Sequence, residues 1–206
     1  MKFPESKLAH KYLDGLKGIE IGGSAHNPFG LDTINVDYTD DMETVFKKEE
    51  FRLCGEKMPV DVVAEGDDLP FKDEEFDFVI SSHVIEHFFD PIKAIKEWLR
   101  VIKPGGYIFT ICPKQDADSL ETRPRTKLSE LIDRHIGVLK KEEVNMKTEH
   151  DHSVITGEPF NERGHWTVWS CEDMLELCKY MKLKVVDWQE TDDKVGNGFT
   201  VVIKKQ

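Results

Sequence analysis

The sequence predicts an α/β fold with three layers, in which helices cover both faces of a mostly parallel sheet. Residues 17–37 have the pattern of two strands joined by a glycine turn, and residues 76–112 have that of a strand, a helix and a strand. Strands joined by a helical crossover lie parallel in one sheet. Residues 183–203 form two apolar runs around a polar stretch, which predicts a closing antiparallel hairpin.

The first predicted helix and strand are followed by a glycine turn at the edge of the sheet where a ligand can bind. Apolar residues recur at helical spacing in residues 5–14, and Ile19 and Ile21 then alternate with Gly18 and Glu20 as in a strand. A turn of two glycines, Gly22 and Gly23, follows at once. Glycine lets the backbone turn sharply and approach a ligand closely.

The second strand ends in Asp37, at the edge where parallel sheets bind their ligands. A carboxylate at that position can accept both hydroxyls of a ribose. The turn is not the dinucleotide fingerprint, because the glycines are adjacent and the third one is missing. Glu20, two residues before the turn, would repel a pyrophosphate but suits a cationic amino-acid group. An NAD-dependent oxidoreductase is therefore disfavoured.

The central elements follow in a regular order. Residues 40–53 predict a helix, and the apolar run from Phe76 to Ile80 predicts a strand buried on both faces. A helix is expected from Pro91, capped by Asp90 and ended by Pro104 and two glycines. Residues 107–112 then form the next strand.

The region after that strand interrupts the pattern. Residues 113–164 are charged and too long for a plain loop in a compact domain, so we interpret them as an insertion. Within them, residues 128–139 show helical spacing. A further helix is expected after Ser170, which forms a capping box with Asp173.

Composition limits the function. A chain of 206 residues makes one domain, and a formal net charge of −12 argues against a nucleic acid partner. The four cysteines form no C-x-x-C pair, which indicates free thiols in a reducing compartment. We see no signal peptide and no apolar run of transmembrane length. We therefore expect a cytoplasmic protein with no membrane partner, as a monomer or homodimer.

Residues 60–112 resemble the central block of the class I S-adenosylmethionine-dependent methyltransferases of the type 11 kind. The motifs occur in the family's order: Glu65 before Asp68-Leu69-Pro70-Phe71, then Phe76-Asp77-Phe78-Val79, Glu86-His87, and Arg100-Val101-Ile102-Lys103-Pro104-Gly105-Gly106. The resemblance implies a Rossmann-like three-layer sandwich with a seven-stranded, mostly parallel sheet of order 3-2-1-4-5-7-6. It implies a single domain over residues 1–206, with the 113–164 insertion after strand 5 packing over the carboxyl ends of the strands as an acceptor-site cap.

The resemblance also implies S-adenosyl-L-methionine as the cofactor. The cofactor-binding residues carried over by motif are Glu20, Gly22, Gly23, Asp37, Glu65 and Ser81, with Glu65 holding the adenine amino group. The family usually carries a full helix before the second strand, whereas only residues 24–32 are available here. We expect the amides of residues 22–25 to face the methionine carboxylate, with a reduced helix dipole.

The histidines leave several alternatives open. His83-Val84-Ile85-Glu86-His87 matches the H-x-x-E-H pattern of zinc peptidases. A divalent cation held by His83, Glu86 and His87 with His150 or His152 is a second alternative, although we predict no metal site. We predict His87 as the catalytic base and His152 as the second candidate, because neutral histidine can accept a proton near pH 7.

The sequence predicts the methyl acceptor less closely than it predicts the cofactor. Residues 165–169 are either an aromatic acceptor wall or core aromatics before a helix. The predicted function is methyl transfer to an oxygen of a small polar acceptor, such as a metabolite or a nucleotide-linked or cell-surface sugar precursor. The alternative is a cofactor-binding, catalytically silent partner subunit.

Overall fold

A computed structural model describes residues 1–115, 123–144 and 164–206. Its sheet has seven strands in the order β3-β2-β1-β4-β5-β7-β6, which confirms the predicted topology. The first five strands pair in parallel, and β7 runs antiparallel to both β5 and β6. The strands are β1 (Lys17–Ile21), β2 (Asp32–Asp37), β3 (Val62–Val63), β4 (Phe76–Ser82), β5 (Ile102–Pro113), β6 (Lys184–Gln189) and β7 (Gly198–Lys204).

The helices are α1 (Lys7–Leu13), α2 (Val45–Cys54), α3 (Pro91–Val101), α4 (Leu128–His135) and α6 (Cys171–Tyr180), with short 3₁₀ turns η1 (Ile85–His87) and η3 (Lys141–Glu143). The helices α1, α2, α3 and α6 begin at Ser, Thr or Asp residues whose side chains accept a hydrogen bond from the first turn. Asp90 accepts a hydrogen bond from the Lys93 amide at 2.9 Å, and Ser170 forms the expected capping box with Asp173.

The end of α3 differs from the prediction. The helix ends at Val101 rather than at Pro104, because Ile102 already pairs with Phe76 of β4. Gly106 instead has a role within the sheet. A Cβ atom on Gly106 would lie 2.4 Å from the Asp77 carbonyl oxygen, so this position needs glycine for close contact between strands.

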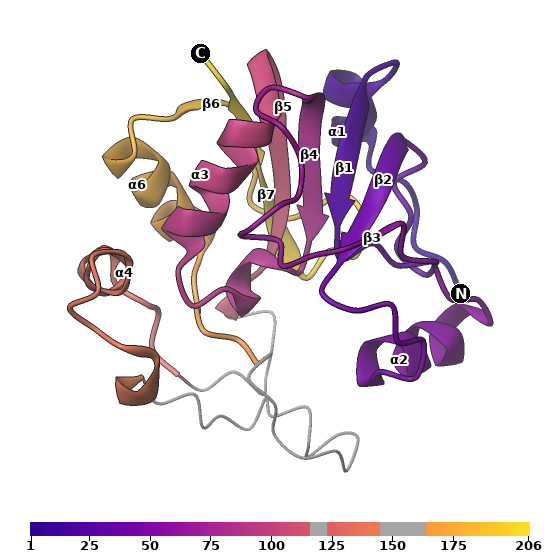
Figure 1. Ribbon diagram of the computed structural model, residues 1–206, viewed down its shortest axis with the longest axis horizontal. Helices are drawn as coiled ribbons and strands as arrows, with labels where there is room; N and C mark the ends of the chain where they lie inside the picture. Colours follow the sequence, from indigo (N-terminus) through magenta and orange to yellow (C-terminus); the bar gives the residue numbers. More distant parts are fainter. Residues whose placement is uncertain (116–122, 145–163) are drawn as a thin grey trace.

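Two apolar clusters cover the two faces of the sheet. Alternate strand residues face α3 and α6 on one side, including Ile19 and Val79, and face α1 on the other, including Phe78 and Ile80. Figure 1 shows the strands β1 and β4 running side by side toward a common edge, with α2 and η1 near it. A ligand at that edge would be held by the ends of β1, β2 and β4 together.

The structure describes only part of the predicted insertion, residues 113–164. Within residues 123–144, α4 contacts α3 and α6, and Leu131 joins the core cluster of that face. The described part of the insertion therefore packs beside these helices, and its remaining residues, 116–122 and 145–163, lie outside the described residues. In the part of the chain that the structure describes, no helix is both long and apolar enough to cross a membrane.

Candidate active site

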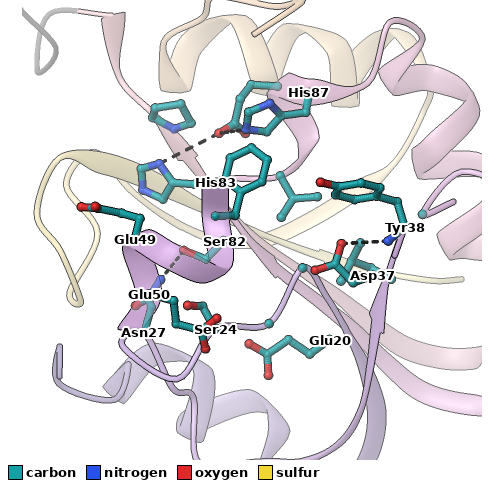
Figure 2. A pocket seen from close by; sticks show the side chains of 18 of the residues that line it. Glu20, Ser24, Asn27, Asp37, Tyr38, Glu49, Glu50, Ser82, His83 and His87 are labelled. Atoms are coloured by element: carbon teal, nitrogen blue, oxygen red, sulfur yellow. Dashed lines mark hydrogen bonds and ion pairs between the residues drawn. The ribbon is translucent and has the colours of Figure 1, made fainter. Parts of the chain in front are cut away.

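A cavity of about 620 Å³ opens at the carboxyl ends of β1, β2 and β4. This volume is typical of a site for a small organic ligand. In Figure 2, Glu20 and Asp37 lie in one part of the cavity and His83 and His87 in another. We call these two parts the glycine-turn end and the histidine end. Their principal residues are Glu20, Gly22, Gly23, Asp37 and Glu65 at the first, and His83, Glu86, His87 and His165 at the second.

The glycine turn has the conformation that its sequence requires. Gly22 has a φ of +68°, and a Cβ atom there would lie 2.8 Å from a methyl group of Val84. A side chain would therefore be strained by the backbone and would also clash. Both glycines of the turn line the cavity.

The amides of residues 22–25 do not face a ligand as expected. The Gly22 amide donates to the Val36 carbonyl at 2.8 Å and the Gly23 amide donates to Asn35 Oδ1 at 2.9 Å. The Ala25 amide donates to Glu50 Oε1, from α2. The expectation is wrong for these three amides, because the short link contains no helix whose first turn would leave its amides unpaired.

Glu20 is a buried carboxylate on the cavity wall. Only 5% of its surface is exposed, and the Thr33 hydroxyl donates to it at 3.4 Å. Burial raises the pKa of Glu20 to about 7, although Lys194 and Thr33 act in the opposite direction. A cationic group entering this end would stabilise the ionised form.

Lys194 reaches this end from the segment between β6 and β7. Its ammonium donates to the carbonyl oxygens of Pro4, at 3.2 Å, and Pro28, and lies 4.2 Å from the centroid of the Phe29 ring. Burial lowers its pKa to about 8. The lysine thus joins three separate segments behind the turn.

Three charged residues of this end come from α2 and were missed from the sequence. Lys47 Nζ lies 3.0 Å from Glu50 Oε2 and donates to the Met58 carbonyl at 2.8 Å, with both side chains buried. Glu49 also lines the cavity. Helical spacing places Lys47 and Glu50 on one face of α2, but a polar helix normally turns such residues to solvent. The sequence therefore contained no signal for their burial.

The carboxylates predicted for the nucleoside both line the cavity. Asp37 ends β2, and its Oδ1 accepts the Tyr38 amide at 2.8 Å. Glu65 follows β3, is exposed, and lines the same cavity. The parallel arrangement of β1, β2 and β3 brings both residues to one edge, where the strand pattern predicted Asp37 and the family resemblance predicted Glu65.

Ser81 is placed differently from the prediction. It is fully buried, with its Oγ 3.1 Å from Thr110 Oγ1, and it is not part of the cavity lining. The neighbouring Ser82 lines the cavity and accepts a hydrogen bond from Asn27 Nδ2 at 3.0 Å. Because strand residues alternate between faces, a shift of one position decides which serine reaches the ligand.

The histidine end is built around Glu86. This side chain is fully buried, and its Oε1 lies 4.0 Å from His83 Nδ1, 3.8 Å from His87 Nε2 and 3.9 Å from His165 Nε2. Burial raises the pKa of Glu86 to about 8, and burial lowers that of His83. Low dielectric favours the neutral form of each group.

The local backbone excludes the zinc-peptidase arrangement. That arrangement needs both histidines on one face of a continuous α-helix. Here His83 has a φ of +56°, and residues 85–87 form only the 3₁₀ turn η1. A non-glycine residue in this left-handed region is uncommon and occurs preferentially at functional sites.

His165 was expected from the sequence only as part of the aromatic acceptor wall, one of two alternatives for residues 165–169, and not as a neighbour of Glu86. Its segment is held by the main chain of Glu86, whose carbonyl accepts the amides of Trp166 at 2.8 Å and Thr167 at 3.2 Å. Trp166 and Trp169 are buried and do not line the cavity, so they are core aromatics rather than an acceptor wall. The other predicted catalytic residue, His152, lies outside the described residues.

The comparisons with known proteins agree with the fold. The family described as "Methyltransferase domain" matches residues 21–110. An uncharacterised protein of Methanocaldococcus jannaschii is 39% identical over 107 residues, covering 50% of this chain and 48% of that protein. A demethylmenaquinone methyltransferase of Clavibacter sepedonicus is 34% identical over 102 residues, covering 50% and 40%. The chain thus spans about half or less of the length of these relatives.

Structural similarity extends over most of the chain. The crystal structure of an S-adenosylmethionine-dependent methyltransferase from Thermotoga maritima superimposes with a TM-score of 0.53 and 18% identity. The match covers 94% of this chain and 84% of that one. At this identity the similarity concerns the fold, including the strands outside the matched residues 21–110.

Proposed function

We propose that this chain is a class I S-adenosylmethionine-dependent methyltransferase that transfers a methyl group from S-adenosylmethionine to an oxygen of a small polar acceptor. The observation that carries the proposal is one cavity with two different ends. Asp37 and Glu65 line the end suited to a nucleoside, and the Glu86 cluster lines the other. The family implies the cofactor.

The glycine-turn end fits a nucleoside that carries a cationic amino-acid chain. Asp37 accepts the ribose hydroxyls, and Glu65 accepts the adenine amino group. Glu20 accepts the ammonium group, and its burial makes the charge pairing strong. The cofactor supplies a methyl group already activated on a sulfonium sulfur. The residues of the cavity therefore contribute mainly by orienting the acceptor oxygen in line with the carbon–sulfur bond.

The histidine end is proposed to receive the acceptor and the proton that it loses. In the simplest form, neutral His87 accepts the hydroxyl proton as the new bond forms. Pro113 and Lys114, at the start of the insertion, line the same cavity. We propose that the 113–164 insertion contributes further to the acceptor side and that the whole chain is one domain.

A small acceptor suits the net charge of the chain and the name of one relative. A net charge of −12 disfavours a nucleic acid backbone. One relative is named for a small molecule, demethylmenaquinone. A metabolite or a nucleotide-linked or cell-surface sugar precursor has hydroxyl groups that fit a cavity of about 620 Å³.

Calorimetry and turnover test this function together. S-adenosylhomocysteine is expected to bind with one-to-one stoichiometry, and incubation with radiolabelled S-adenosylmethionine should label an acceptor from a panel of hydroxylated metabolites. Binding without labelling of any acceptor would favour the silent partner subunit. Tight NAD binding with no binding of S-adenosylhomocysteine would contradict the proposal.

A further inference from the structure

The Glu86 cluster has the composition and spacing of a metal site. One ligand atom from each of Glu86, His87 and His165 lies within 4.8 Å of the other two. Small movements of the side chains would bring all three to about 2.0–2.2 Å from a common centre. The His87 and His165 rings are already close, with centroids 4.7 Å apart at 75°.

The carboxylate of Glu86 needs a partner that the described residues do not supply. It is 0% exposed, and neither of its oxygens has a hydrogen-bond partner among them. Buried polar groups are almost always paired, since an unpaired one costs free energy of desolvation. A cation on the cavity side would meet this need directly.

The protein also holds the cluster in place from behind. The Glu86 carbonyl accepts the amides of Trp166 and Thr167, so the segments that carry the ligands are joined at the backbone. Arg123 donates to the His165 carbonyl at 2.7 Å, and Arg134 donates to the Trp166 carbonyl at 3.0 Å. Metal ligands are commonly fixed by such outer contacts.

We propose that Glu86, His87 and His165 bind one divalent transition-metal cation on the acceptor side of the cavity. Two imidazoles and one carboxylate suit Mn²⁺, Fe²⁺, Co²⁺ or Zn²⁺ better than Mg²⁺ or Ca²⁺, which prefer oxygen ligands alone. Three protein ligands leave open positions for an acceptor. This departs from the sequence-based prediction of no metal site, and it replaces the distant His150 or His152 by His165.

The role of the metal in methyl transfer rests on the proposed function, whereas the presence of the metal site does not. An acceptor hydroxyl bound at an open position would have a lowered pKa and would lose its proton to water. Its oxygen lone pair then forms the bond to the methyl carbon while the carbon–sulfur bond breaks and its electron pair stays on sulfur. In this metal-assisted mechanism, His87 is a metal ligand rather than the catalytic base. The favoured acceptors carry a second oxygen beside the hydroxyl, as vicinal diols and α-hydroxy acids do.

Cobalt titration of the chelator-treated protein tests the site without any methyl transfer. We expect one Co²⁺ per chain, with visible absorption bands from its bound state. Glu86→Gln and His165→Gln should each weaken Co²⁺ binding by at least about 100-fold. Mutating a residue that only supports a metal ligand already lowers metal affinity by up to about 100-fold, and loss of a ligand itself should cost no less. His135→Gln is the matched control, because His135 Nδ1 also lies 2.8 Å from a carboxylate oxygen, that of Asp90, outside the cavity. It should bind Co²⁺ like the wild type.

Binding of S-adenosylhomocysteine separates this inference from the proposed function. Loss of Co²⁺ binding in His165→Gln with cofactor binding retained supports the metal site, and it also shows that the variant is folded. Co²⁺ binding that is absent from the wild type, or equally strong in both variants, would overturn it. Co²⁺ binding without binding of S-adenosylhomocysteine would leave the metal site intact and contradict the proposed function.

Discussion

The glycine-turn end and the histidine end of the cavity differ in how the chain builds them. The glycine-turn end collects residues that follow β1, β2 and β3 in succession, so its main parts lie close together in the sequence. The histidine end joins η1 to His165, which follows the insertion. A local strand pattern is enough to find the glycine turn and Asp37, although it does not find the α2 residues or Lys194. Only the folded chain brings together the histidine end.

Glu20 at one end and Glu86 at the other are both buried carboxylates, and their surroundings differ. Glu20 is near the Lys194 ammonium and accepts a hydrogen bond from Thr33. Glu86 is near imidazoles alone among the described charged groups. This difference suggests that the first end favours an organic cation, whereas the second can accept a compact ion or a proton.

The largest effect is expected at the histidine end. His87→Ala should lower turnover by about 100-fold to 10,000-fold, whether His87 acts as the base or as a metal ligand. Calorimetric affinity for S-adenosylhomocysteine should stay within about twofold of the wild type, since the ring is at the other end. Unchanged turnover would show that His87 is structural and that alignment alone drives the reaction.

The next effect concerns the glycine-turn end. Asp37→Ala should weaken binding of S-adenosylhomocysteine by about 1.5–3 kcal/mol, the worth of hydrogen bonds to a charged group. Isothermal titration measures this loss. Asp61→Ala is a suitable control, because Asp61 accepts the Asn35 amide at 2.8 Å beside the same strands but does not line the cavity. Equal losses in the two variants would contradict a ribose contact at Asp37.

A smaller effect should appear as a pH dependence of cofactor binding. Glu20 has a pKa raised to about 7 by burial, and only its ionised form attracts the ammonium group. Affinity should therefore fall as pH decreases below 7, by at most about tenfold per pH unit, because the ligand must first displace the proton. The carboxylate is about half ionised at pH 7 and mostly ionised one pH unit higher, so affinity should level off by about pH 8. Glu20→Gln should bind more weakly at pH 7.5 and lack this dependence between pH 5.5 and 7.5.

The smallest effect is expected at Ser81. Ser81→Ala removes a hydroxyl that contacts Thr110 inside the sheet, so stability should fall by about 1 kcal/mol. Affinity for S-adenosylhomocysteine should remain within about twofold, as measured by calorimetry. A loss comparable to that of Asp37→Ala would mean that the bound cofactor reaches deeper into the sheet than the cavity does.

The strand pattern predicted much of this molecule because it depends on local periodicity. The parallel crossover, the closing hairpin and the capping box at Ser170 follow from short sequence segments, whereas the order of the strands was implied by the family resemblance. The end of α3 was not predicted correctly from the sequence. The helix ends before the signal at Pro104 because Ile102 already pairs with Phe76 in the sheet. Ser81 and Ser82 have similar sequence contexts, and only the alternation of β4 distinguishes them.

The missed residues of the site have a shared cause, which is long-range contact. Glu50 accepts the Ala25 amide across the turn, and His165 lies beside Glu86 because the adjacent Trp166 and Thr167 amides donate to the Glu86 carbonyl. Neither contact has a periodic pattern in the sequence. Buried charged residues such as Lys47 also contradict the usual preference of polar helices for solvent, so no local rule could have assigned them.

A crystal structure with S-adenosylhomocysteine tests the division of the cavity most directly. We predict the ribose hydroxyls at about 2.7–3.2 Å from the Asp37 carboxylate and the ammonium group beside Glu20. The sulfur atom should face the open space between the glycine-turn end and the Glu86 cluster, with the cluster left uncovered for an acceptor. Cofactor atoms that occupy the histidine end, or a ribose bound away from Asp37, would contradict the account.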